Sequence, residues 1–430
     1  MREEIDIEQL MKERVLLVGV DTGEEEDFDR SMDELKSLAE ACNMQVVGIV
    51  TQRMETVSKA LYIGTGKVAE VRSFAKTEEA ELVIFEDTLS PSQLRNLKEE
   101  LDLPVMDRTG LILDIFATRA KSREAKLQVE VARLKYLLPR LVGLHDALSR
   151  QGGASGSMSS KGAGEKKLEL DRRKIEHRIA ELSKELEEVS KERETQRKKR
   201  VNSRVPQVAL AGYTNAGKST LMNAMVDAYV QDEKKRVLEK DMLFATLETA
   251  VRKIDNGRKR PFYLADTVGF IHKLPHGLIK AFRSTLEEVK NADLILQVVD
   301  FSDEHYKRHM EVTKETLREL GAGEIPVIYV YNKADLCMDK LPKISDNRIY
   351  LSAKKKEGLT ELLTMITDKL YADNEEAAFL IPYDKGQIVS YLCENAEVIE
   401  QNYVEKGVYL VVNCHQSDST KYKEYRVGRS

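Results

Sequence analysis

A glycine-rich segment that ends in a lysine and two hydroxyl residues lies near the middle of the chain. Residues 212–220 read GYTNAGKST, which fits the pattern G-x-x-x-x-G-K-[ST]. The segment follows the apolar run PQVALA and precedes STLMNAMV, so we expect a strand that ends at the loop and a helix that begins there. Backbone N–H groups and a helix N-terminus in that arrangement face phosphate groups. The residues predicted to surround a nucleotide are Gly212, Tyr213, Thr214, Asn215, Ala216, Gly217, Lys218, Ser219 and Thr220.

Individual side chains of this loop have expected roles in phosphate chemistry. Lys218 would reach the β- and γ-phosphates, and the Ser219 hydroxyl would ligate Mg²⁺. Further along, residues 263–270 read YLADTVGF, a strand pattern that ends in D-x-x-G. We expect Asp266 to hold Mg²⁺ through water and the Gly269 N–H to sense a γ-phosphate.

Two later motifs predict which base is bound. VIYVYNKADL ends a strand with N-K-x-D, and Asp335 in it could accept hydrogen bonds from N1–H and the 2-amino group of guanine. Adenine offers neither donor, so a buried Asp would be left unpaired against it. Lys333 can lie over the base, and Asn332 can tie its loop to the phosphate loop. The S-A-K motif expected to close over the other edge of the base is formed by Ser352, Ala353 and Lys354. We therefore predict GTP and GDP as ligands.

The switch region between these motifs offers two threonines. MLFATLETAVR contains Thr246 and Thr249, and we prefer Thr246 as a further Mg²⁺ ligand that acts in catalysis with Lys218 and Gly269. Phe270 follows D-x-x-G, where Ras-like enzymes have a Gln that orients the attacking water. Phe cannot do that, so we expect slow intrinsic hydrolysis. A cation, a rearranged switch or a partner surface would then complete the site.

The motifs belong to an α/β chain of several domains. Residues 1–120 alternate buried-strand patterns (RVLLVGV, MQVVGIV, ELVIFED) with amphipathic ones, which predicts a small α/β domain with a mostly parallel sheet. Residues 204–371 alternate again and contain every nucleotide motif, so they predict a P-loop GTPase domain with a mostly parallel sheet. Residues 376–430 predict a small α+β domain in which we find no catalytic constellation.

Residues 121–200 have a different, helical pattern. Their apolar positions step by three and four, as in a coiled coil, and are Leu127, Val131, Leu134, Leu138, Leu141, Leu168, Ile175, Ile179, Leu182, Leu186 and Val189. A Gly- and Ser-rich basic stretch at 149–167 interrupts them and predicts a flexible loop. We expect an antiparallel hairpin with this loop at its tip. The plain alternative is that the stripe is only packing and the loop only a linker.

Composition and charge indicate which classes of protein and partner fit this chain. The 430 residues carry a net charge of −5, yet residues 119–200 contain 22 Lys and Arg against 13 Asp and Glu. That segment is therefore at +9 and the remainder at −14, which favours a polyanionic partner. The four cysteines are far apart and form no C-x-x-C, which is typical of a reduced cytoplasmic protein without structural zinc. No apolar run is long enough for a membrane span and no signal-peptide pattern begins the chain.

Nearly the whole chain resembles the HflX-type ribosome-associated GTPases. GYTNAGKSTLMN, LFATLETAVR, LADTVGFIHKLPHGLIKAFRSTLEEV and NKADL are similar to the GTPase motifs of that family. YIGTGKVAEV in the first domain and LELDRRKI after the predicted loop also match its pattern. The resemblance implies that the N-terminal domain and the hairpin dock on the 50S subunit. It also implies that the hairpin loop approaches the peptidyl-transferase region of the 23S rRNA, and that the protein splits or rescues stalled 70S ribosomes.

The resemblance further implies site residues and ions. Contact with rRNA is expected from Arg150, Lys161, Lys166, Lys167, Arg172 and Arg173. The loop departs from the usual GG-x-GTRGPGE of the family, which leaves the contacts of the tip open. By analogy with related GTPases, Asn215 would help to coordinate K⁺ near the phosphates. We expect a monomer in the cytoplasm, with peripheral membrane association left open.

Other readings stay open at the level of sequence. A P-loop ATPase or kinase could use the hairpin only for dimerisation, although N-K-A-D argues against it. A GTPase of ribosome assembly needs the same rRNA contact. A role in tRNA modification is weakened because we find no catalytic Cys or cofactor constellation outside the predicted GTPase domain. The second G-x-G-K, at residues 64–67, is read as a turn and helix start, and a second nucleotide site there stays open.

Overall fold

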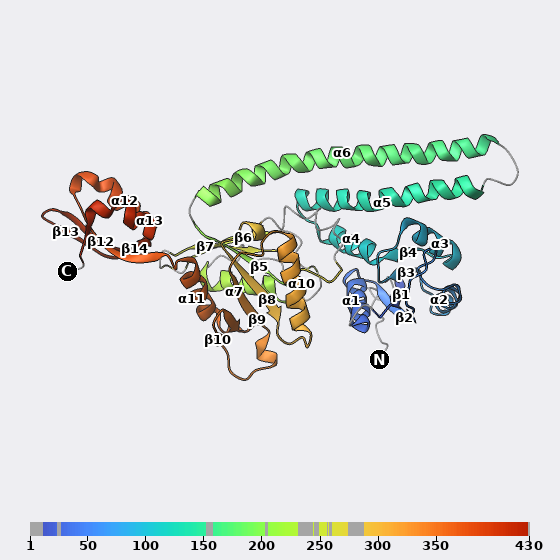
Figure 1. Cartoon of the computed structure of the whole chain (residues 1–430), viewed down its shortest axis with the longest axis horizontal. Coiled ribbons are helices and arrows are strands. Elements are labelled where there is room, and N and C mark those ends of the chain that lie inside the picture. The colour runs from blue at the N-terminus through green and yellow to red at the C-terminus, as the bar shows by residue number, and fades with distance from the viewer. Residues whose placement is uncertain are drawn as a thin grey trace, which may run out of the picture. The chain divides into compact units, whose positions relative to one another are not determined.

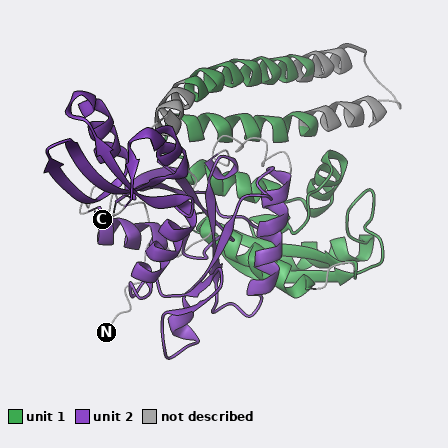
Figure 2. Cartoon of the chain, turned by 60° about the vertical axis from the view of Figure 1, so that its left-hand side comes forward, with its two compact units in different colours: residues 1–195, 241–248, 273–284 green, residues 196–240, 249–272, 285–430 purple. Residues whose placement is uncertain are grey.

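The computed structural model describes residues 12–23, 27–151, 158–202, 205–230, 244, 249–255, 257, 260–273 and 288–428, without the side chains of 141–151, 158–168 and 192–202. The chain divides into two compact units (Figure 2). The first comprises residues 1–195, 241–248 and 273–284, and the second comprises 196–240, 249–272 and 285–430. Short pieces of the expected GTPase segment therefore belong to the first unit.

The first unit begins with a four-stranded parallel sheet in the order β2-β1-β3-β4 (Figure 1). Its strands are β1 (Arg14–Asp21), β2 (Gln45–Arg53), β3 (Leu82–Phe85) and β4 (Val105–Asp107). Its helices are α1 (Phe28–Ala41), α2 (Thr65–Thr77), α3 (Pro91–Leu101) and α4 (Arg108–Arg119). The predicted parallel α/β domain is confirmed, but its fourth strand and fourth helix were not predicted.

Local signals explain where these helices begin. Ser90 caps α3 through a reciprocal capping box with Gln93, and Pro91 occupies the first turn, where its missing N–H costs nothing. The G-x-G-K segment forms the start of α2, whose N-cap is Gly64. The core between sheet and helices is apolar and contains Leu16, Val18, Val71, Val83, Phe85 and Leu97, among others.

Two long helices form an antiparallel hairpin, α5 (Arg123–Gln151) and α6 (Met158–Asn202) (Figure 1). Two ion pairs fix the direction, because Arg123 contacts Glu185 at 2.6 Å and Arg178 contacts Glu130 at 3.2 Å. The seam between them buries apolar residues of the predicted stripe, namely Leu127, Val131 and Leu182, packed with Leu134, Leu186 and Val189.

The loop predicted over 149–167 is too long. Helix α5 continues to Gln151 and α6 already begins at Met158, so helix occupies most of that segment. The run KKLELDRRK that follows contains strong helix formers, and a helix extends with one added hydrogen bond per residue once it has begun. Gly162 and Gly164 therefore lie within α6 and do not end it.

The second unit contains a seven-stranded sheet in the order β10-β11-β9-β8-β5-β7-β6. The central strands β5 (Gln207–Ala211), β7 (Phe262–Asp266), β8 (Leu294–Asp300), β9 (Val327–Asn332) and β11 (Arg348–Tyr350) are parallel. The edge strands β6 (Ala250–Ile254) and β10 (Lys343–Ser345) are antiparallel. The helices are α7 (Lys218–Tyr229), η3 (Ala334–Leu336), α10 (Tyr306–Glu319) and α11 (Leu359–Leu370). This is the predicted mostly parallel α/β fold.

The chain ends in a four-stranded antiparallel sheet in the order β13-β14-β12-β15. Its strands are β12 (Asn374–Ile381), β13 (Glu397–Val404), β14 (Gly407–His415) and β15 (Arg426–Val427), joined by η4 (Tyr383–Lys385), α12 (Gly386–Asn395), α13 (Gln416–Lys421) and η5 (Lys423–Tyr425). The predicted α+β unit is confirmed, with α13 and β15 as additions. Among the described residues, no helix is both long and apolar enough to cross a membrane.

Candidate guanine-nucleotide site

The loop between β5 and α7 can be formed only by glycines at two places. Gly217 has a φ of 89°, which L side chains rarely adopt, and a Cβ there would lie 2.2 Å from Asn332 Nδ2. A Cβ on Gly212 would lie 2.2 Å from the carbonyl oxygen of Val298. The spacing of the motif is therefore required by backbone shape and by close approach of neighbouring strands.

Lys218 begins α7 and is almost fully buried. Its Nζ donates to the carbonyl oxygens of Gly212 at 3.0 Å and Tyr213 at 2.8 Å, so the ammonium lies under the loop. Burial lowers the pKa of Lys218 to about 8, and the charge of Asp266 opposes this shift. A bound anion would restore the charged form, which suits this ammonium to a phosphate.

The ends of α7 and β7 meet beside this ammonium. Ser219 Oγ donates to Asp266 Oδ2 at 2.7 Å, and Asp266 is fully buried. Gly269, three residues after that carboxylate, lies against the loop. A Cβ on Gly269 would be 2.7 Å from the Cα of Thr214 and 3.0 Å from Lys218 Nζ. The hydroxyl, the carboxylate and the glycine are therefore gathered at one point.

The residue after D-x-x-G is bonded to the same loop. The Phe270 N–H donates to Gly212 O at 3.1 Å, and the Thr214 N–H donates to Phe270 O at 2.7 Å. The Phe270 side chain is buried. Tyr213, between these bonds, stacks on His309 with a centroid distance of 3.8 Å. Phe270 thus contributes backbone contacts and no polar side chain to the site.

Asn332 at the end of β9 links three motifs. Its Nδ2 donates to Ala216 O at 3.0 Å, and its Oδ1 accepts from the Ala353 N–H at 3.0 Å. Asn332 and Ala353 are both only 2% exposed, so neither bond competes with water. The phosphate loop, N-K-x-D and S-A-K are held together by this one amide. Ser352 is buried with them, whereas Lys354 is exposed.

Two charged pairs flank the expected base position. Lys333 Nζ contacts Asp300 Oδ2 at 2.7 Å, and Lys355 Nζ contacts Asp335 Oδ2 at 3.2 Å. Burial raises the pKa of Asp335, but hydrogen bonds from Ser352 and Lys355 and the Lys355 charge outweigh it and lower that pKa. Asp335 therefore stays an acceptor for two N–H groups.

Asp300 and Lys355 were not predicted. Asp300 ends β8 at the same edge of the sheet as Asn332, and Lys355 follows S-A-K, so both could have been found from strand ends and motif neighbours.

Several predicted residues fall outside this geometry. Thr246 lies outside the described residues. Arg172 and Arg173 are on α6, exposed, and contact Glu176 and Glu169 at 3.0 Å each. The other expected rRNA contacts have side chains outside the description, namely Arg150, Lys161, Lys166 and Lys167. Asn215 is exposed in the loop, with a φ of 60°.

Known proteins are similar to this chain along most of its length. Three family models match, described as GTP-binding GTPase N-terminal over residues 29–117, GTP-binding GTPase Middle Region over 119–200 and 50S ribosome-binding GTPase over 207–333. The chain is 47% identical to the GTPase HflX of Caldanaerobacter subterraneus subsp. tengcongensis over 399 residues, covering 92% of this chain and 90% of that protein. The chain belongs to the HflX family of GTPases.

A second relative carries the same name. The GTPase HflX of Escherichia coli (strain K12) is 38% identical over 400 residues, which are 92% of this chain and 91% of that one. A solved structure of a GTP-binding protein from Sulfolobus solfataricus in complex with GDP is 25% identical, with a TM-score of 0.43, over 84% of this chain and 99% of that one. This member of the HflX family is a GTP-binding enzyme that hydrolyses GTP, and its GTPase domain matches the model of 50S ribosome-binding GTPases.

Proposed function

We propose that this HflX GTPase binds the large ribosomal subunit in a GTP-dependent way and splits or rescues stalled ribosomes. The observation that carries the proposal is a stiff, basic hairpin, α5–α6, in a chain whose GTPase domain matches a 50S ribosome-binding model. Residues 119–200, which include most of the hairpin, contain 22 Lys and Arg residues against 13 acidic ones. Cationic side chains on an elongated element suit it to the phosphates of rRNA.

The rRNA contacts are proposed along the hairpin and its tip. They comprise Arg150, Lys161, Lys166, Lys167, Arg172 and Arg173. Arg172 and Arg173 are exposed, and their pairs within one helix are weak enough to be exchanged for phosphate. A ribosomal partner would place this activity in the cytoplasm, with the 23S rRNA near the peptidyl-transferase region as the target of the tip.

Co-sedimentation with 50S subunits tests this proposal. Wild type is expected to pellet with 50S in a non-hydrolysable GTP analogue and much less in GDP. Arg172→Glu with Arg173→Glu should weaken that binding severalfold, because two attractive contacts become repulsive. Lys307→Glu with Lys314→Glu on exposed positions of α10 changes the net charge equally and serves as the control. Equal binding in both nucleotides would contradict the proposal.

We propose a phosphate site built by Lys218, Ser219, Asp266 and Gly269. The Lys218 ammonium would neutralise the β- and γ-phosphates, and the Gly269 N–H would donate to the γ-phosphate. Ser219 Oγ and Asp266 Oδ2, which are 2.7 Å apart, form the hard oxygen set that Mg²⁺ prefers, so the residues present fit that ion. Mg²⁺ supplies charge neutralisation on the phosphates when it is bound. Thr246 is proposed as its further ligand from the switch.

The base is proposed to be selected by Asp335, with Lys333 over its plane. Buried contacts around Asn332 hold that loop in place, so the acceptor geometry is formed before the base arrives. Asp335→Asn should weaken GTP binding about 10- to 100-fold and favour xanthine nucleotides, because the pattern of donors and acceptors is inverted. A nucleotide-competition assay with GTP, XTP and ATP measures this. Unchanged preference for GTP in the variant would reject the assignment.

Hydrolysis by the protein alone is proposed to be slow. Phe270 offers no polar side chain, and its backbone is engaged with the phosphate loop. We propose that K⁺ near Asn215 or the ribosome completes the site. Turnover measured in KCl and in NaCl, with and without 50S subunits, separates these sources. Equal turnover in both salts would reject the role of K⁺.

A further inference from the structure

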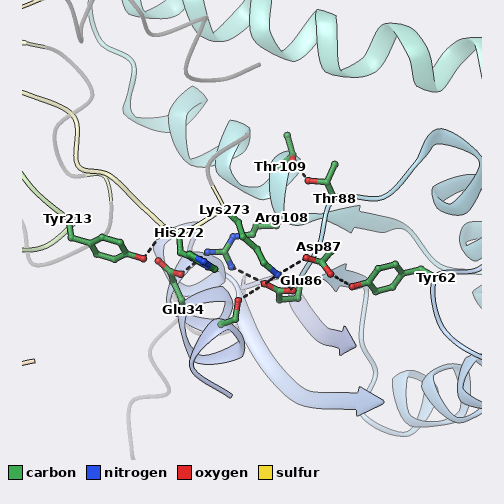
Figure 3. Close-up of polar contacts among 11 residues, drawn as sticks. Glu34, Tyr62, Glu86, Asp87, Thr88, Arg108, Thr109, Tyr213, His272 and Lys273 are labelled. Carbon is green, nitrogen blue, oxygen red and sulfur yellow. Dashed lines mark hydrogen bonds and ion pairs between the residues drawn. The ribbon is translucent and has the colours of Figure 1, made fainter. Parts of the chain in front are cut away.

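A carboxylate pair directly follows β3 in the first unit. The Glu86 side chain is fully buried, and that of Asp87 is one-third exposed. Lys273 Nζ lies 3.0 Å from both carboxylate oxygens of Glu86 and 2.6 Å from Asp87 Oδ1 (Figure 3). One ammonium therefore bridges two neighbouring carboxylates.

This pair needs the lysine charge. Burial, followed by the Asp87 charge, raises the pKa of Glu86, while Lys273 opposes the rise. Arg108 Nη1 lies farther from Glu86, at 3.7 Å, and Arg108 also contacts Glu34 at 2.8 Å. Two adjacent carboxylates in a buried site repel each other unless a cation lies between them. The cluster is thus built around Lys273.

Lys273 connects this cluster to the GTPase motif through the chain itself. It comes four residues after Gly269, and the boundary between the two compact units falls directly before it. Its backbone has a φ of 54°, which residues with side chains rarely adopt and which persists only where the surroundings enforce it. Lys273 makes its three contacts to carboxylate oxygens from this backbone conformation.

The residues between the motif and Lys273 are also held. Phe270 pairs with the phosphate loop through two backbone bonds, and the His272 N–H donates to the Tyr213 hydroxyl at 2.9 Å (Figure 3). The segment from Phe270 to Lys273 is only four residues long and has contacts at both ends, which leaves the adjacent Gly269 little freedom to move. Lys273 therefore lies at one end of a short segment whose other end, Gly269, lies against the phosphate loop.

We propose that Lys273 is a positioning residue for the γ-phosphate. Its ion pairs with Glu86 and Asp87 fix the segment after D-x-x-G, and Gly269 thereby stays beside the Lys218 ammonium. GDP lacks the phosphate that Gly269 would contact, so this anchor raises the affinity for GTP selectively. The carboxylates of the N-terminal domain thus act on nucleotide choice. The inference rests on the proposed role of Gly269.

The test compares the affinities of the full-length chain for fluorescent GDP and a fluorescent non-hydrolysable GTP analogue. Lys273→Met should weaken binding of the GTP analogue about fivefold or more, the lower range of measured couplings between sites. Affinity for GDP should stay within about twofold. Lys273→Arg keeps the charge and should restore most of the difference.

Two further variants keep the test decisive. Asp87→Asn removes one half of the anchor from the partly exposed side, and it should change the ratio of affinities in the same direction even if Lys273→Met does not fold. Arg140→Met removes another pair of the first unit, 2.9 Å from the buried Asp107, and should leave the ratio unchanged.

The possible results separate three cases. An unchanged ratio in the folded anchor variants, or an equal loss of both nucleotides, would overturn the role of Lys273. Gly269→Ala serves as the reference for displacement of this glycine, because its Cβ would lie 2.7 Å from the Cα of Thr214. If it lowers GTP affinity while the Lys273 and Asp87 variants do not, the role of Gly269 stands and the anchor fails. If none of them changes the ratio, both fail.

Discussion

The nucleotide site and the helical hairpin hold their polar side chains in opposite ways. In the nucleotide site, Lys218, Asp266 and Asn332 are buried and bonded to backbone or to each other. On the hairpin, Arg172 and Arg173 of α6 are exposed and pair along their own helix. Buried polar networks fix one geometry because every lost bond is costly, whereas exposed pairs are worth little. The first region is therefore organised before its ligand binds, whereas the exposed pairs of the second are easily exchanged.

The largest effect is expected where a buried charge meets phosphate. Lys218→Met should lower kcat/KM for GTP about 100- to 1,000-fold, as for the loss of one preorganised donor in other enzymes. Phosphate release measures it. Lys356→Met removes an exposed lysine that contacts Asp227 at 2.8 Å, and it should leave turnover nearly unchanged. A loss of less than tenfold in Lys218→Met would show that preorganisation of this site contributes little.

The hairpin depends on apolar packing more than on charge. Leu182 is 1% exposed in the seam between α5 and α6, so Leu182→Ala should lower the free energy of unfolding by about 2–4 kcal/mol. Chemical denaturation followed by circular dichroism measures this change. Affinity for GTP should be unaffected. A loss of GTP affinity that accompanies the loss of stability would contradict the separation of the two regions.

The pKa of Lys218 predicts how nucleotide binding depends on pH. The free protein holds this lysine with a pKa of about 8, and bound phosphate raises that value again. Affinity for GTP is therefore full below pH 8 and falls as the pH rises through 8, by up to about tenfold per unit. A titration from pH 7 to 9.5 measures it, with Lys218→Met as the variant that should lose the slope. A flat profile in wild type would reject the pKa shift.

The smallest effect is expected at an exposed ion pair. Arg123 and Glu185 contact each other at 2.6 Å across the hairpin but are well exposed. Arg123→Gln should change the free energy of unfolding by less than about 1 kcal/mol. Thermal melting at low and high salt measures it. A loss as large as that of Leu182→Ala would mean that charge, and not packing, holds the two helices together.

The alternation of strands and helices and the nucleotide motifs could be predicted from the sequence because they depend on local rules. The glycines at 212 and 217 are required by backbone space, and the strand before them is uniformly apolar. The apolar stripe that contains Leu127 and Leu182 likewise predicted the hairpin, because steps of three and four residues place these side chains on one face of a helix. The end of α5 and the start of α6 could not be placed, since Gly and Ser favour a loop locally while neighbouring helix overrides them.

The Lys273 cluster shows what no local pattern contains. Lys273 is more than 180 positions from Glu86 and Asp87, and nothing around the lysine distinguishes it from a solvated surface charge. Their contact arises only when the segment after D-x-x-G folds with the first unit. Long-range pairing of buried charges is a property of tertiary structure, and the sequence motif stops four residues short of it.

Separation of ribosomal subunits tests the central claim most directly. Purified 70S ribosomes are mixed with the protein in GTP, a non-hydrolysable GTP analogue or GDP, and subunits are resolved on a sucrose gradient. The account predicts that 70S particles come apart with the GTP analogue, that the protein then migrates with 50S, and that GDP leaves 70S intact. Intact 70S particles in all three nucleotides, with the protein at the top of the gradient, would contradict it.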